Sequence, residues 1–210
     1  MLEKRIALGA LAALLAGCTA DKPAPTSFEV RAPLFVVGSN SGGNGDVNLG
    51  THLNGDEEVC PACTVSTPAD SRAQGQAIFR VSGDGSSVDF TLIATNIDNA
   101  FMAHIHCGAS GTNGPIRMWL YPPSAAPLPP FGPTGTPGPS GSGRHSGVLA
   151  SGTFSPTGVT CPDGTSLLNA IRAGGTYVNV HTNDGAGAAN TGPGDFPGGE
   201  IRGQIDDDNN

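Results

Sequence analysis

Residues 77–94 read AIFRVSGDGSSVDFTLIA, and this stretch decides the fold class. Apolar side chains recur at every second position of 77–81 and 88–94, as they do in a strand that buries one face. Between the two runs, Ser82–Ser87 is rich in glycine, aspartate and serine, which favour tight turns. The pattern therefore predicts two antiparallel strands joined as a β-hairpin.

Similar short runs recur along the rest of the chain. Bounded by glycine, aspartate, asparagine or proline, they predict further strands at Phe101–Cys107, Ile116–Tyr121, Gly147–Phe154, Tyr177–His181 and Glu200–Ile205. The only helical candidate is Ser166–Arg172, whose leucine and isoleucine residues fall on one helical face. We expect an all-β domain, an antiparallel Greek-key sandwich or barrel of about 7–8 strands with long Gly/Pro-rich loops.

Two long segments interrupt this rhythm. Pro122–Gly143 consists almost entirely of proline, glycine, serine, threonine and alanine. Because it lacks apolar periodicity, burial cannot offset its ordering entropy, and we predict a disordered insertion between two strands. The glycine-rich run Asp184–Gly199 is predicted to be a second long loop.

The first residues of the chain predict export. Lys4 and Arg5 precede an apolar run, Ile6–Ala16, which the small residue Gly17 closes. This is the pattern of a signal peptide spanning residues 1–17. The 12 residues from Ile6 to Gly17 are too few for a permanent membrane span, which needs roughly 20.

Residues 15–18, Leu-Ala-Gly-Cys, resemble the lipobox of bacterial lipoproteins. The resemblance implies that the Cys18 thiol is acylated and that the preceding peptide is cleaved, so that lipid anchors the mature chain to a membrane. Thr19, in place of aspartate, implies sorting to the outer membrane or cell surface of the bacterial envelope. An ordinary signal peptide with an incidental cysteine is the alternative.

These features divide the chain into five parts. A lipidated tether, 18–27, follows the signal peptide, and 28–48 holds a possible first strand, Phe28–Val37, and a glycine-rich link. The β domain occupies 49–205, and a polar tail occupies 206–210.

The net charge excludes nucleic acid as a partner. The whole chain carries a formal charge of −8, and removing residues 1–17 takes away Glu3, Lys4 and Arg5, which leaves −9. No basic cluster compensates this acidic surface, which would repel a phosphate backbone.

Four further cysteines remain after Cys18, at positions 60, 63, 107 and 161. An even number in an exported chain predicts two disulfides. Three connectivities are possible, of which we favour Cys60–Cys63 with Cys107–Cys161. A zinc site built on the Cys-x-x-Cys pair is the alternative.

The histidines predict a site on one face of the sheet. In a strand, His104 and His106 point to one face and Ile105 to the other. The same alternation puts His181 on a face with Tyr177 and Asn179, and groups a third set of polar residues, Glu200, Arg202 and Gln204.

If these strands are neighbours, His104, His106 and His181 converge as ligands for copper or zinc. Glu200 or Asp184 could then be a fourth ligand or an acceptor that sets a histidine tautomer. In the alternative, the histidines donate hydrogen bonds to loop carbonyls and order residues 184–199. His52 and His145 lie outside this pattern and are predicted to be exposed.

Several segments carry a family resemblance. They are 53–59 (LNGDEEV), 75–79 (GQAIF), 103–108 (AHIHCG), 111–115 (GTNGP), 177–182 (YVNVHT) and 199–205 (GEIRGQI). In this order, over residues 49–205, they resemble a CHRD (chordin-type) domain. The chain departs from the family at Cys60-Pro-Ala-Cys63, where a proline pair is usual, and in the insertion at 122–143. In chordin, such domains belong to an extracellular protein that sequesters growth factors, but the resemblance implies fold and location more than activity.

Three functions are compatible with these residues. The first is a lipid-anchored extracytoplasmic binding module for an unidentified protein or glycan, with copper or zinc on the histidines. The second is an enzyme resembling copper/zinc superoxide dismutase, although the zinc-binding loop of that family has no counterpart here. The third is a structural or adhesion module of the envelope without metal. No Gly-x-Ser-x-Gly or His-Glu-x-x-His motif indicates a hydrolase, and Glu57 and Glu58 should point to opposite faces.

Overall fold

A computed structural model of the chain describes residues 46–122 and 138–206. The predicted signal peptide, the tether with Cys18 and the strand at Phe28–Val37 lie outside the described residues. So do residues 123–137 of the insertion and 207–210 of the tail.

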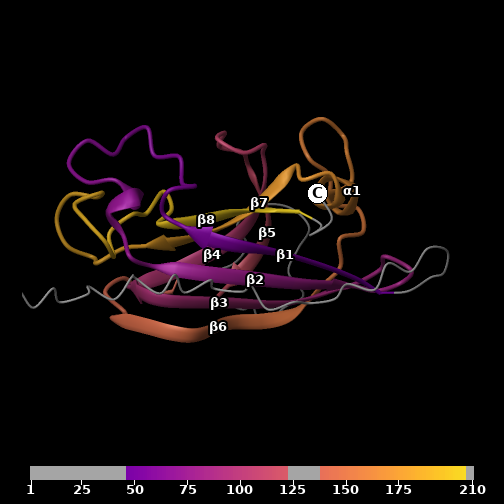
Figure 1. The fold of residues 1–210 in the computed structure, drawn as a ribbon, viewed down its shortest axis with the longest axis horizontal. Coiled ribbons are helices and arrows are strands. Elements are labelled where there is room, and N and C mark those ends of the chain that lie inside the picture. The colour runs from indigo at the N-terminus through magenta and orange to yellow at the C-terminus, as the bar shows by residue number, and fades with distance from the viewer. Residues whose placement is uncertain (1–45, 123–137, 207–210) are drawn as a thin grey trace, which may run out of the picture. The chain divides into compact units, whose positions relative to one another are not determined.

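In the described part of the chain, eight strands make up the domain (Figure 1). They are β1 (Val47–Asn54), β2 (Gln74–Val81), β3 (Val88–Asp98), β4 (Ala100–Cys107), β5 (Ile116–Tyr121), β6 (Arg144–Phe154), β7 (Thr176–Thr182) and β8 (Ile201–Ile205). The helices are a 3-10 turn, η1 (Pro68–Asp70), and α1 (Leu167–Arg172). Neither described helix is long and apolar enough to cross a bilayer. The predicted all-β class is confirmed.

All strand pairs are antiparallel, in the order β5-β4-β7-β8-β1-β2-β3-β6. The terminal strands of this order, β5 and β6, contact each other, so the sheet forms a nearly closed barrel or sandwich. After β5 and β6 the chain returns to pair β7 with β4, which is a Greek-key connection.

The predicted hairpin is β2–β3. Phe79 lies opposite Phe90 and both are buried, as the alternation requires. The Ser82 amide donates to the Ser87 carbonyl over 2.9 Å and closes the turn. Both strands extend beyond the predicted runs because the ladder continues to Gln74 opposite Thr95.

Strand β1 was not predicted as a strand of its own. It starts at Val47, inside the segment assigned to a glycine-rich link, and Gly50 weakens its alternation. It pairs with β2 along its whole length, and its last residue, Asn54, lies opposite Arg202 of β8. Through these contacts β1 joins the predicted hairpin to β8, which in turn pairs with β7, the strand that carries His181.

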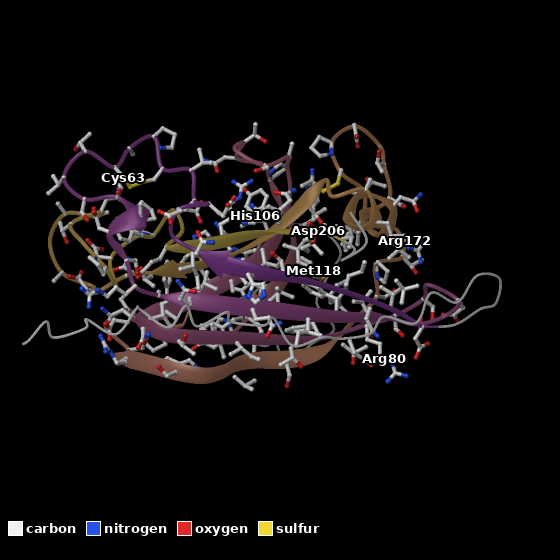
Figure 2. The ribbon with its side chains drawn as sticks, viewed as in Figure 1. Cys63, Arg80, His106, Met118, Arg172 and Asp206 are labelled. Atoms are coloured by element: carbon white, nitrogen blue, oxygen red, sulfur yellow. A yellow bond between two sulfur atoms is a disulfide. The ribbon has the colours of Figure 1, made fainter. Side chains whose placement is uncertain are left out.

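Residues 46–122 and 138–206 contain two disulfides, Cys60–Cys63 and Cys107–Cys161, which is the favoured pairing (Figure 2). The second links the end of β4 to the segment before α1. Helix α1 begins after Ser166, whose hydroxyl accepts a hydrogen bond from the Asn169 amide over 3.3 Å.

The last part of the predicted insertion, residues 138–143, contacts the β domain. The Gly138 amide donates to the Phe101 carbonyl over 2.7 Å, and the Gly141 amide donates to the Asn183 carbonyl over 2.8 Å. These contacts join the end of the segment to β4 and to the loop after β7, and the disorder of 122–143 stays a prediction.

The apolar core lies on one face of the sheet and draws residues from all eight strands. It includes Leu53, Phe79, Val81, Leu92, Ile105, Met118, Val178, Val180 and Ile201. Every residue of β7 is nevertheless buried. Its second face is therefore also covered, and that is the face to which alternation assigns the histidines.

We expect Gly203→Ala to destabilise the domain. A Cβ atom at Gly203 would lie 1.9 Å from the His52 carbonyl oxygen and 2.3 Å from Thr51 Oγ1, so β8 would have to move away from β1. The expected loss is about 1–3 kcal/mol in the free energy of unfolding, measured by urea denaturation. Gly192→Ala is the control, since no atom lies within 4 Å of that position. Equal stability of the two variants would contradict the close β1–β8 contact.

Candidate metal centre

The pairing of β4 with β7 brings the three histidines together. His104 lies opposite Asn179, His106 opposite Tyr177, and His181 opposite Met102. All three imidazoles are buried, with exposed fractions of 0%, 7% and 5% for His104, His106 and His181. One ring nitrogen from each lies within 4.8 Å of the others, which is close enough for one metal ion to contact all three.

Backbone carbonyls determine the tautomers of two histidines. His106 Nδ1 lies 2.8 Å from the Gly114 carbonyl oxygen, and His181 Nδ1 lies 2.9 Å from that of Pro197. Because a carbonyl can only accept, each Nδ1 carries the hydrogen and each Nε2 carries a lone pair. A protein prepares a histidine in this way to bind a metal through Nε2.

With His104, the three histidines have more buried acceptor nitrogens than there are donors to satisfy them. Its Nδ1 lies 3.1 Å from His181 Nε2 and donates to that lone pair, which makes His104 Nε2 an acceptor as well. The Nε2 atoms of His104 and His106 are buried without a hydrogen-bond partner. Buried acceptors without donors are rare in folded proteins, and a cation would satisfy them.

Aromatic rings hold the imidazoles in place. The Trp119 ring meets His104 edge to face with 4.3 Å between centroids, and Tyr177 stacks on His106 at 4.8 Å and 10°. The guanidinium carbon of Arg202 lies 3.4 Å from the Tyr177 ring centroid. Since β7 lies between β4 and β8, Tyr177 separates this cation from His106.

The electrostatic environment keeps the histidines neutral. Burial, together with the neighbouring His181 and His106, lowers the pKa of His104 to about 2. Burial and His106 lower the pKa of His181 to about 3. Burial also lowers the pKa of His106. Neutral imidazole is the form that binds copper or zinc.

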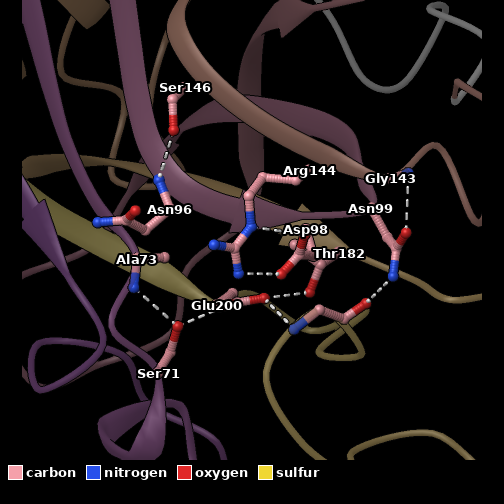
Figure 3. A network of polar contacts seen from close by, with 11 residues as sticks. Ser71, Ala73, Asn96, Asp98, Asn99, Gly143, Arg144, Ser146, Thr182 and Glu200 are labelled. Carbon is pink, nitrogen blue, oxygen red and sulfur yellow. Dashed lines mark hydrogen bonds and ion pairs between the residues drawn. The ribbon is translucent and has the colours of Figure 1, made fainter.

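Glu200 does not contact the histidines, contrary to the prediction that it is a fourth ligand or an acceptor for one of them. Its buried carboxylate accepts hydrogen bonds from the Ser71 hydroxyl, the Thr182 hydroxyl at 2.6 Å and the Gly194 amide at 2.8 Å (Figure 3). Thr182 follows His181 directly, so it points to the opposite face of β7. The alternation was extended one residue too far, because β8 begins only at Ile201. Glu200 instead anchors the loop between β7 and β8.

Asp184 also lies outside the cluster. It is exposed, and its carboxylate accepts a hydrogen bond from the Ala186 amide over 2.8 Å within its own loop. The other two histidines are remote from the site. His52 is exposed, as predicted, whereas His145 is half-buried in β6, opposite Ile97.

Arg202 and Gln204 share the histidine face, as alternation predicted, and they position a loop. Arg202 Nη2 donates to the Ala109 carbonyl over 3.0 Å, and Gln204 Nε2 donates to the Gly108 carbonyl over 2.9 Å. Both contacts hold the loop that ends at Gly114, whose carbonyl orients His106.

Two residues of the site were missed. Trp119 lay in a predicted strand, but only the β4–β5 register places it opposite His104. Glu58 was set aside as one of two adjacent acids, yet it is half-buried and its Oε2 is buried without a partner. Burial raises the pKa of Glu58, against the opposing effects of the Val59 amide, Arg202 and Asn179. Its place in the segment LNGDEEV, which resembles the CHRD family, was the only signal in the sequence.

The fold and the site together define a small disulfide-bonded β domain with a candidate metal centre. The model of the CHRD domain family matches residues 49–205, most of the chain and nearly all of the eight strands, and the chain belongs to this family. No curated protein matches the chain.

We expect acid to destabilise the metal-free protein through these histidines. An unfolded histidine binds a proton below about pH 6.5, whereas His104 and His181 in the folded state do so only near pH 2–3. The free energy of unfolding should therefore fall as the pH drops from about 6.5 to 4.5, by on the order of 2 kcal/mol per histidine. Urea denaturation at several pH values measures it.

His104→Gln should lose part of this pH dependence, whereas His52→Gln, which changes an exposed histidine, should keep all of it. The carboxylates titrate alike in both variants, so the comparison isolates the buried imidazole. An unchanged slope in His104→Gln would contradict a neutral buried His104.

Proposed function

We propose that this protein is an extracytoplasmic metal-binding module that holds one copper or zinc ion on His104, His106 and His181 and is attached to a membrane through lipid on Cys18. The observation that carries the metal site is the pair of buried Nε2 lone pairs on His104 and His106 that no donor satisfies. Three neutral imidazoles within reach of one ion are a ligand set suited to either metal. The ion would replace the His104–His181 hydrogen bond, which occupies the His181 Nε2 lone pair in the metal-free protein.

A purely structural role explains the hydrogen bonds of two Nδ1 atoms but not the burial of the unpartnered Nε2 atoms. His106 and His181 do donate to loop carbonyls, as a loop-ordering role requires. These hydrogen bonds use Nδ1 alone, however, and the Nε2 atoms of His104 and His106 remain buried without a hydrogen bond. Leaving each such acceptor unsatisfied costs about 1–3 kcal/mol, a cost that a bound cation would remove.

The envelope location rests on separate features. Lys4 and Arg5, the short apolar run and Gly17-Cys18 have the order of a lipoprotein signal peptide. Two disulfides are typical of an oxidising compartment outside the cytoplasm. We expect the domain to act at the outer membrane or cell surface, on a protein or glycan partner that the chain does not identify.

Elemental analysis tests the metal site. The protein, produced in an oxidising compartment without a histidine tag and then incubated with copper or zinc, should retain about one equivalent after gel filtration. A variant with alanine at 104, 106 and 181 should retain none, because no ligand remains. His52→Ala, which changes an exposed histidine, should keep full stoichiometry. A folded wild-type protein that retains neither metal would refute the site and favour the structural role.

Acylation tests the anchor. Expressed in a bacterial host with radiolabelled palmitate, the full chain should incorporate label and sediment with membranes, because acyl chains on Cys18 partition into the bilayer. Cys18→Ala should lose both properties, and Thr19→Ala should retain them. Label that persists in Cys18→Ala would exclude this anchor without affecting the metal site.

A further inference from the structure

Glu58 reaches the covered face of the sheet from the loop that follows β1. The Cys60–Cys63 disulfide braces this loop, and Asn113 Nδ2 donates to the Val59 carbonyl over 2.9 Å. Glu58 Oε1 accepts a hydrogen bond from the Val59 amide over 3.1 Å, which leaves Oε2 buried and unpartnered. The neighbouring Glu57 is exposed, so only one of the two acids faces inward.

Asn179 lies at the centre of the same face. It is opposite His104 on β4 and opposite Arg202 on β8, and it precedes His181 by two residues. The side chain is 2% exposed, and its Oδ1 atom has no hydrogen-bond partner.

Gly199 brings Glu58 and Asn179 together. A Cβ atom at Gly199 would lie 2.4 Å from Glu58 Oε2 and 2.8 Å from Asn179 Nδ2, so both side chains pack against the bare glycine. Its φ of +134° is one that residues with a Cβ rarely adopt. The backbone thus leaves room for a carboxylate and an amide beside the histidines.

The buried polar groups around the histidines include more hydrogen-bond acceptors than donors. His104 Nε2, His106 Nε2, Asn179 Oδ1 and Glu58 Oε2 are all buried without a hydrogen bond, and the nearest side-chain donor to Glu58 Oε2, Asn179 Nδ2, packs against the same glycine. Arg202, the nearby cation, already donates to the Ala109 carbonyl and to Asn113 Oδ1 and stacks on Tyr177. A metal ion would satisfy the nitrogens but would leave the two oxygens unsatisfied. A water molecule bound to that ion has two hydrogens, one for each oxygen.

We propose that Glu58 and Asn179 accept the two hydrogens of a water molecule that occupies the open coordination position of the metal, so that the centre favours small neutral hydrogen-bond donors over anions. This inference rests on the metal site proposed above. Three protein ligands with water in the remaining position are the arrangement of an exchangeable, reactive site rather than of a closed structural one. The Glu58 carboxylate would repel an anion that tried to replace the water, and azide ion offers no hydrogen to either oxygen.

Azide binding to the Cu(II)-loaded protein tests this selectivity, through the azide-to-copper charge-transfer band. Wild-type protein should bind azide weakly. Glu58→Gln, which removes the charge at nearly constant size, should bind azide about tenfold or more tightly, as expected for one charge lost near the ion. Glu57→Gln removes an exposed charge from the adjacent position and should leave the azide affinity unchanged.

Each outcome separates the two proposals. Copper that is retained by Glu58→Gln with unchanged azide affinity would overturn the role of Glu58 and leave the metal site intact. Loss of copper from Glu58→Gln would make Glu58 a direct ligand and would equally overturn the proposal. Failure of the wild-type protein to hold copper would refute the metal site itself.

A second variant covers the case in which Glu58→Gln does not fold. Glu58→Asp retains the charge but shortens the side chain, and it should raise the azide affinity by less than tenfold. An azide affinity equal to that of wild type would contradict the proposal.

Discussion

The antiparallel pairing of β4 with β7 is the constraint on which the rest of the structure depends. One register places Ile105 opposite Val178 in the apolar core and His104 opposite Asn179 on the other face. Because side chains alternate between faces, a shift of one residue would place the histidines among aliphatic side chains and the aliphatic side chains on the polar face. Core packing and the candidate site are therefore stabilised by the same hydrogen-bond ladder, and neither can be moved without the other.

Burial of a polar face requires partners for every group on it, and the loops supply them. Loop carbonyls of Gly114 and Pro197 orient two imidazoles. Arg202 and Gln204 donate hydrogen bonds to other carbonyls of the loop that contains Gly114. The Glu200 carboxylate secures the other loop by accepting from a strand hydroxyl and a loop amide. Loop order and histidine geometry are consequently coupled, so changes in the long glycine-rich loop should alter the site even though it supplies no ligand.

The acceptors that remain unsatisfied support the proposed metal site more directly than the fold does. A CHRD domain can be built from aliphatic alternation and short turns, but nothing in a stable β domain requires two buried imidazole lone pairs beside an unpartnered carboxylate and amide oxygen. Natural proteins keep such groups buried where a ligand completes them. Glu58, on a disulfide-braced loop, extends the site beyond the sheet, and it gives a neutral set of imidazoles a nearby negative charge.

Local sequence was sufficient for the hairpin, the all-β class, the shared face of His104 and His106, and the joint placement of Asn179 with His181, because these follow from the two-residue period of a strand. Pairing decided the rest. Which strands are neighbours, and in which register, depends on contacts between residues far apart in the chain, so Trp119 and Glu58 could not be assigned to the site in advance. Glu200 shows the limit most clearly: it precedes β8, next to a glycine with φ of +134°, where strand alternation no longer determines the direction of a side chain.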